Sequence, residues 1–144
     1  MARSAKKLDR ILRVRSLQLD LTRADEVQAA DKLRAEADLK ARILQLADNV
    51  APTRSPAPAS ATSLMAAAHY RDRLHQSVVA ADQRIATANR GLDFARERTV
   101  EAKRDQSAIE KLIARAEADA ALAAVRALEN STSPLRSKNR HGPC

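Results

Sequence analysis

The feature that most constrains this chain is a heptad pattern between residues 64 and 127. Steps that alternate between three and four residues visit nineteen positions there, and only three of them are not apolar: Arg71, Thr99 and Gln106. A straight helix drifts by ~20° per heptad from a 3.5-residue repeat, so a pattern this long requires a left-handed supercoil against another helix. The segment predicts one arm of a coiled coil.

The partner arm is expected within the same chain. Residues 1–51 contain neither proline nor glycine and are rich in residues of high helix propensity. Three of the five prolines follow at once, in a stretch rich in Pro, Ala, Ser and Thr where a helix interior is excluded. We therefore expect an all-α fold, a long antiparallel two-helix coiled-coil hairpin with helices over 1–51 and 63–130, a turn over 52–62 and a basic, disordered tail over 131–144.

The two predicted helices differ in length. With Val50 placed opposite Leu64, the numbers of facing residues add to about 114, and the first helix runs out near residue 109 of the second. The second helix then overhangs. Its start is expected to be capped by Ser63 or Thr62, whose hydroxyl groups can accept a bond from the first amides of the helix.

Composition excludes several other classes. Tyr70 and Phe94 are the only aromatic residues, and the chain has no β-branched runs of the kind that form sheets. No apolar run approaches 18 residues and no secretory signal pattern is present. The single cysteine, Cys144, either indicates a reducing compartment or carries no information. A transit peptide or a membrane-surface helix over residues 1–21 is the alternative for the basic start.

Charge is concentrated at the two ends of the sequence. Residues 1–15 carry a net charge of +5 and residues 131–144 carry +3, which together make the whole formal charge of +8. An antiparallel hairpin brings both ends together, which predicts a rod with a positive base and a neutral shaft. Solvated basic ends are one interpretation, and an acidic partner is the other.

Two surfaces look incompletely covered by the hairpin. From Leu112 to Leu128 the second helix is apolar almost all round, which is typical of a buried helix, although alanine also simply promotes helix. Near the turn, the first helix carries two apolar stripes about 100° apart. The first consists of Leu33, Ala37, Leu44, Ala47 and Ala51, and the second consists of Leu39, Ile43, Leu46 and Val50. We expect Tyr70 and Phe94 to be exposed beside these stripes. Docking of a partner, broad packing and self-association all remain open.

Chemistry-bearing motifs are absent from the sequence. No histidine, cysteine or carboxylate cluster has the spacing of metal ligands, and no glycine-rich loop could hold a phosphate. A nucleophile with a base and an orienting acid is also missing. We therefore predict no metal, no cofactor and no enzymatic activity. Nucleic-acid binding is disfavoured because acids alternate with bases along the helices and aromatic residues are nearly absent.

At full length the chain resembles the FliJ family of bacterial flagellar type III export proteins. The resemblance lies in a basic start leading into Leu8, Ile11, Leu12, Arg13 and Arg15, a long first helix, a short interruption, and a longer second helix rich in Ala, Arg and Glu. Members of that family form an antiparallel coiled coil similar to the shaft of rotary ATP synthases. They insert it into the hexameric export ATPase, contact the membrane export gate, and in some cases bind export chaperones.

The resemblance implies a location, partners and contact residues. The chain would lie in the bacterial cytoplasm, peripheral to the inner membrane at the flagellar base, as a non-enzymatic stalk and activator. Its ATPase contacts would be Arg10, Arg13, Arg15, Leu112, Leu122, Val125 and Leu128. Its export-gate contacts would be Leu39, Ile43, Leu46, Val50, Tyr70 and Leu74. The alternative function is a general coiled-coil scaffold or adaptor.

Overall fold

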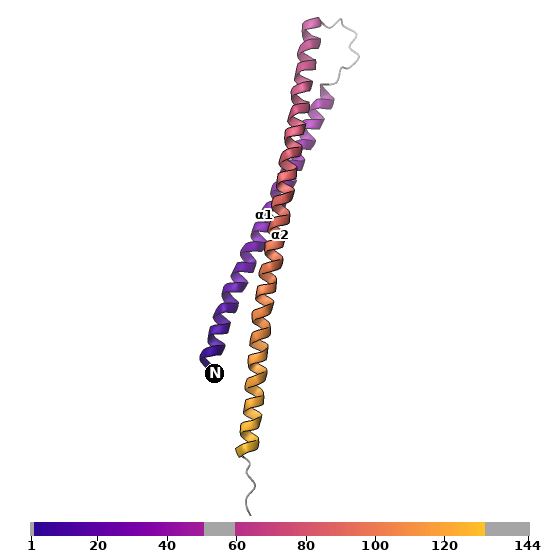
Figure 1. The fold of residues 1–144 in the computed structure, drawn as a ribbon. Helices are drawn as coiled ribbons and strands as arrows, with labels where there is room; N and C mark the ends of the chain where they lie inside the picture. Colours follow the sequence, from indigo (N-terminus) through magenta and orange to yellow (C-terminus); the bar gives the residue numbers. More distant parts are fainter. Residues whose placement is uncertain (1, 51–59, 132–144) are drawn as a thin grey trace, which may run out of the picture. The chain divides into compact units, whose positions relative to one another are not determined.

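The computed structural model describes residues 2–50 and 60–131. Helix α1 spans Ala2–Asn49 and helix α2 spans Ala61–Ser131 (Figure 1). The described ranges contain no strand, and the two helices pack against each other. The all-α hairpin with a longer second helix is confirmed. Met1 and Ala51 of the first expected helix, residues 52–59 of the expected turn and residues 132–144 of the expected tail lie outside the described residues.

The start of α2 differs from the sequence prediction. The hydroxyl oxygen of Ser60 accepts a hydrogen bond from the Ser63 amide at 3.2 Å, and its carbonyl oxygen accepts one from the Leu64 amide at 3.1 Å. Ser60 is therefore the N-cap, and the prediction of Ser63 or Thr62 was wrong. Both of those residues already lie inside the helix. The helix begins earlier because Ser60 supplies the oxygen that a first-turn amide needs.

The chain divides into two compact units, and each helix contributes to both. The long unit comprises Leu17–Lys103, and the end unit comprises Met1–Ser16 together with Arg104–Cys144. In the long unit α1 and α2 lie side by side and run in opposite directions (Figure 1).

In the long unit, the predicted heptad positions of α2 from Ala67 onward form the interface, which we call the seam. The first predicted position, Leu64, is 55% exposed and lies outside it. Every predicted position from Ala67 to Ala102 is buried or half-buried, and Ala81 has no exposed surface. Of the other residues of α2 in this unit, only Ala80 is not exposed. Small alanines at alternate seam positions let the two backbones approach closely.

The seam of α1 in this unit also follows steps of three and four, but it includes polar residues. The covered positions at these steps are Leu19, Thr22, Glu26, Ala29, Leu33, Glu36, Lys40, Ile43, Ala47 and Val50, and Ala30 beside them is also half-buried. Thr22 is buried, and its hydroxyl group donates to the Leu19 carbonyl oxygen at 2.9 Å. Among the described residues, no buried side-chain nitrogen or oxygen lacks a hydrogen-bond partner. The polar side chains are thus tolerated because each one finds a partner.

Polar contacts across the seam fix how the helices align. Thr99 donates from its hydroxyl group to the Thr22 carbonyl oxygen at 3.2 Å. Four ion pairs join the helices in the long unit: Lys40 with Asp82, Glu36 with Arg84, Glu26 with Arg96, and Asp25 with Arg98. In all five contacts the two residue numbers add to between 120 and 123. The predicted alignment of Val50 with Leu64 was therefore wrong.

The error is one heptad, and it has a physical cause. A slip of seven residues brings seam positions back into alignment, so apolar periodicity alone does not distinguish the two registers. The polar pairs do distinguish them. Seven residues before Asp82, Arg84, Arg96 and Arg98 stand His75, Ser77, Asn89 and Gly91, so none of the four positions offers the acid or the arginine that pairs with α1 in the observed register.

The end unit shows the same kind of packing over a shorter length. Arg15 forms an ion pair with Asp105 at 2.9 Å, and this register places Leu12 opposite Ile109. Both apolar residues are half-buried, as are Leu8 and its counterpart Ile113. Within this unit the heptad positions of α2 are covered as far as Ile113.

Candidate partner-binding surfaces

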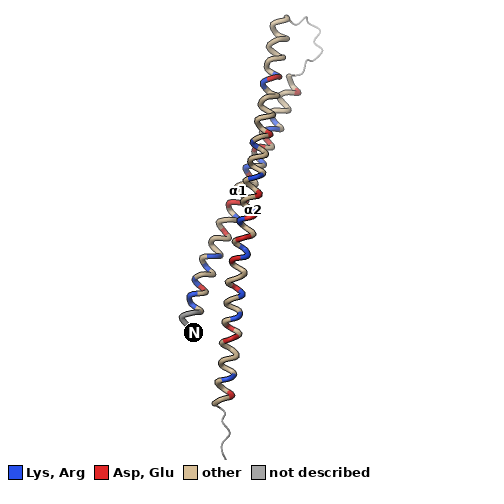
Figure 2. The backbone as a smooth tube through the Cα atoms, in the orientation of Figure 1, with Lys and Arg blue, Asp and Glu red and all other residues tan. Residues whose placement is uncertain are grey.

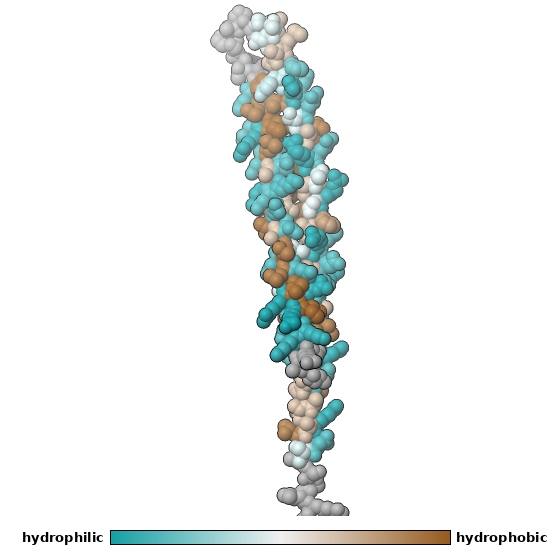
Figure 3. Space-filling model, turned by 90° about the vertical axis from the view of Figure 1, so that its left-hand side faces the viewer, coloured by the Kyte–Doolittle hydropathy of each residue, from teal (hydrophilic) through white to brown (hydrophobic). Residues whose placement is uncertain are grey.

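The first candidate surface is the end of α2. All residues from Ala114 to Ser131 are exposed, including the larger apolar residues Leu122 (55%), Val125 (50%) and Leu128 (67%). Leu112, just before this stretch, is 48% exposed. Figure 3 shows this end as a largely tan and brown surface with teal side chains on one side. This part of α2 continues the helix without a covering partner, and its many alanines favour that because alanine has the highest helix propensity.

The uncovered stretch begins later than the sequence suggested. The predicted alignment ended α1 near residue 109 of α2, whereas Ile109 and Ile113 are half-buried and continuous exposure starts at Ala114. The difference follows from the register, because a shift by one heptad carries the start of α1 farther along α2. Leu112 thus lies beside the covered seam, and Leu122, Val125 and Leu128 lie beyond it.

The basic start of α1 belongs to the same end unit. Lys6, Lys7, Arg10 and Arg13 are exposed, and basic residues outnumber acidic ones along this part of α1 (Figure 2). No acidic residue occupies the first turn, although an acid there would stabilise the helix by interacting with its dipole. Arg15, which the family resemblance grouped with Arg10 and Arg13, instead pairs with Asp105. The outward positive charge therefore comes from the residues before Arg15.

The predicted stripe near the turn is divided by the seam. Ile43 and Val50 are half-buried in the interface with α2, whereas Leu39 and Leu46 are 42% and 48% exposed. Leu44, from the other predicted stripe, is also exposed (41%). The first helix thus presents separate leucines near its end instead of one continuous stripe of four.

The aromatic residues are exposed as predicted. Tyr70 is 47% exposed and Phe94 is 61% exposed. The guanidinium carbon of Arg98 lies 6.0 Å from the centre of the Phe94 ring, a distance compatible with a weak cation–π contact. Leu74, which the resemblance paired with Tyr70, is buried in the seam.

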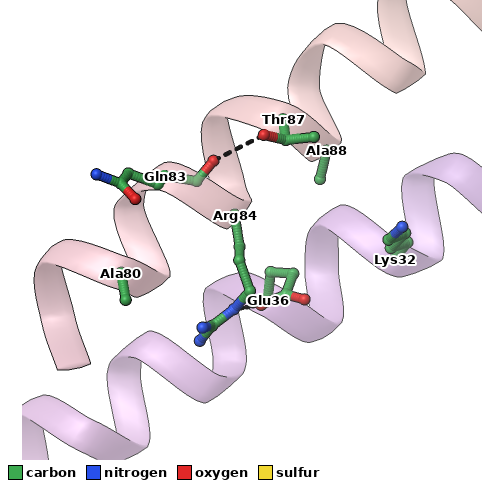
Figure 4. Close-up of a pocket in the computed structure, with 7 residues that line it drawn as sticks. All are labelled: Lys32, Glu36, Ala80, Gln83, Arg84, Thr87 and Ala88. Carbon is green, nitrogen blue, oxygen red and sulfur yellow. Dashed lines mark hydrogen bonds and ion pairs between the residues drawn. The ribbon is translucent and has the colours of Figure 1, made fainter.

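A shallow groove of about 430 Å³ lies between the helices of the long unit. Figure 4 shows Arg84 reaching from α2 to Glu36 on α1, while Thr87 donates to the Gln83 carbonyl oxygen. Glu36 accepts from Arg84 at 2.9 Å, so two of the charged groups lining the groove neutralise each other. The hydroxyl of Thr87 is already committed to the backbone. We assign no ligand to this groove, which forms because Ala80 and Ala88 are small.

Neither a metal site nor a membrane-spanning helix is found among residues 2–50 and 60–131. No group of three or more His, Cys, Asp or Glu residues is placed to hold a metal ion. None of the described helices combines the length and apolar character needed to cross a membrane.

The sequence interpretation missed a second heptad pattern at the end of α2. The segment was described as apolar all round, but its apolar residues include a second set at heptad spacing: Ala114, Ala118, Ala121, Val125 and Leu128. The spacing was visible in the sequence, and it was overlooked because the alanines of the main seam run through the same segment.

Comparisons with known proteins identify no relative. No protein-family model, no curated protein and no solved structure matches this chain.

Proposed function

We propose that this chain is a non-enzymatic coiled-coil component of a bacterial flagellar type III export apparatus, where it acts as stalk and activator of the export ATPase. The observation that carries the proposal is the exposed apolar end of α2, residues 114–131, in the same compact unit as the basic start of α1. A helix that exposes leucine and valine beyond the reach of its own partner is suited to enclosure by another protein.

The two parts of the end unit would have different roles in binding. Leu122, Val125 and Leu128 would be enclosed by the ATPase ring and hold the complex together. Arg10 and Arg13 would meet acidic side chains and speed the encounter. Arg15 would support the hairpin through Asp105.

The export gate and chaperones would bind elsewhere on the chain. Of the residues that the family resemblance assigns to the gate, Leu39, Leu46 and Tyr70 are the well-exposed ones. We propose that they make the gate contact. The chain would then lie at the cytoplasmic face of the inner membrane, held there by its partners.

Stimulation of a purified hexameric export ATPase tests the proposal. The chain should raise ATP turnover and the hexamer population of the ATPase, and should hydrolyse nothing alone. Unchanged turnover and hexamer population at a several-fold excess would exclude the stalk function.

Binding kinetics separate the apolar from the charged contribution. Val125→Asp should raise the dissociation rate, because it places a charge in the enclosed surface. Val100→Asp is the matched control, since both valines are 50% exposed on α2. Arg10→Glu with Arg13→Glu should mainly slow association, and the effect should shrink as salt shortens the screening length from ~10 Å at 0.1 M to ~3 Å at 1 M. Variants that all bind like the original chain would show that the end unit makes no contact.

A coiled-coil scaffold is the second candidate function. The exposed leucines of α1, Leu17 (63%) and Leu21 (66%), favour it because they lie outside the seam. A scaffold would form higher oligomers through these residues and leave ATPase turnover unchanged. The ATPase assay therefore decides between the two functions.

A further inference from the structure

The second apolar stripe at the end of α2 lies away from the seam. At 100° per residue, the stripe formed by Ala114, Ala118, Ala121, Val125 and Leu128 is centred roughly 140° from the line of seam positions through the same segment. All five residues are exposed. A partner on this stripe would therefore contact α2 without displacing α1 from the seam.

The stripe is complementary to a second copy of itself. When two copies of α2 run antiparallel with Ala121 facing Val125 of the second copy, Ala118 faces Leu128 of the second copy. Each large side chain then meets a small one, and the twofold axis repeats both contacts. The long unit uses the same arrangement, because its register places Leu33 opposite Ala88 and Ala47 opposite Leu74.

The residues that flank the stripe fit the same alignment. Antiparallel coiled coils bring like flanking positions together, as Asp25 and Arg98 do in the hairpin. In the paired α2 helices, Arg115 lies opposite Glu129 of the second copy. The twofold symmetry also places Glu129 opposite Arg115 of the second copy. Leu122, 55% exposed, meets Leu122 of the second copy on the axis itself. Apolar and charged positions thus select one alignment.

We propose that a second copy of this chain binds the stripe, so that the protein forms an antiparallel twofold dimer through the ends of α2. The contact extends over about 15 residues, or ~22 Å of helix, and an interface of this size belongs to the weak, transient class. We expect a dissociation constant of roughly tens of micromolar.

The dimer would also regulate partner binding, and this consequence rests on the proposed function. Leu122, Val125 and Leu128 would be covered in the dimer, and they are the residues that we assign to the ATPase contact. The dimer and the ATPase complex could not form at the same time, because both cover these residues. If the dimer forms but ATPase turnover does not change, the proposed function is refuted and the dimer is not.

Sedimentation equilibrium of the full chain tests the dimer directly, with Cys144→Ser in every variant to prevent disulfide formation. The original sequence should pass from monomer to dimer as its concentration rises to about 1 mM. Val125→Asp should abolish the dimer and Val100→Asp should leave it intact. A monomer at every concentration, or a dimer that responds equally to both substitutions, would overturn the proposal. A chain that stays monomeric alone but binds an added protein or lipid vesicles through Val125 would assign the stripe to that occupant instead.

A charge swap tests the alignment. Arg115→Glu alone and Glu129→Arg alone should each weaken the dimer, by roughly fivefold, because each breaks two symmetric pairs. The double variant restores both pairs with reversed sign and should recover most of the affinity. A double variant weaker than either single variant would refute this pairing.

An engineered disulfide locates the axis. Leu122→Cys should oxidise readily to a covalent dimer, because two copies of the residue meet there. Val100→Cys should not do so under the same conditions. Equal cross-linking of the two variants would show random collision and contradict the proposed axis.

Discussion

Arg84 donates from Nε to the Oε2 atom of Glu36 at 2.9 Å, across the seam between the two helices. Glu36 occupies a seam position with its side chain only 21% exposed, whereas Arg84 reaches in from the flank with 45% exposed. A slip by one heptad would offer Ser77 in place of Arg84. The pair thus helps to select one register among several that the apolar seam permits equally.

Reversing the charge of Arg84 should destabilise the hairpin. Arg84→Glu places a second carboxylate against Glu36, and we expect the free energy of unfolding to fall by about 1–2 kcal/mol. Adding Glu36→Arg restores opposite charges and should recover most of the loss. Urea unfolding followed by far-UV circular dichroism measures both. A double variant no more stable than Arg84→Glu would show that the two side chains do not interact in solution.

Enlarging the seam residue Ala81 should push the helices apart. Ala81 has no exposed surface, so Ala81→Leu has no room for the added atoms and should cost about 1–3 kcal/mol. Ala86→Leu, on the exposed side of the same helix, is the control and should change stability by only a few tenths of a kcal/mol. Thermal unfolding of the two variants makes the comparison. Equal stabilities would mean that the helices do not pack closely at Ala81.

Removing the Ser60 hydroxyl should loosen the first turn of α2. Ser60→Ala leaves the Ser63 amide without its acceptor, at a cost of about 0.5–2 kcal/mol. The amides of Ser63 and Leu64 should then exchange hydrogen faster, as followed by nuclear magnetic resonance. Ser63→Ala is the control, because its hydroxyl is not the cap. Faster exchange in the control and not in Ser60→Ala would assign the cap to Ser63 after all.

The sequence predicted the elements of this fold better than their alignment. The apolar steps from Ala67 onward identified the seam of α2, because burial and spacing agree along its whole covered length. The seam of α1 was harder to predict, because Thr22, Glu26, Glu36 and Lys40 occupy covered positions that a search for apolar residues passes over. A seven-residue repeat also carries no information about slips of seven residues.

The sequence predicted that the end of α2 is exposed, but it placed the first exposed residue too early. An all-round apolar segment beyond the reach of α1 is visible in the sequence, but its first residue depends on the register. A separate error affected the expected stripe near the turn, because Ile43 and Val50, which the family resemblance assigned to the export gate, belong to the seam in either register. For the register, the missing information lies in the charged pairs across the helices and not in apolar spacing.

The most direct test of this account is a paired cross-linking measurement of the register, because the register decides where α1 ends along α2 and hence which surface a partner meets. With Cys144→Ser as background, Leu33→Cys is combined with either Ala88→Cys or Ala81→Cys. The register of the polar contacts places Leu33 opposite Ala88, so the first pair should close an intramolecular disulfide in the monomer and the second should not. Preferential closure of the Leu33 and Ala81 pair would contradict the account, as would disulfides that form only between chains.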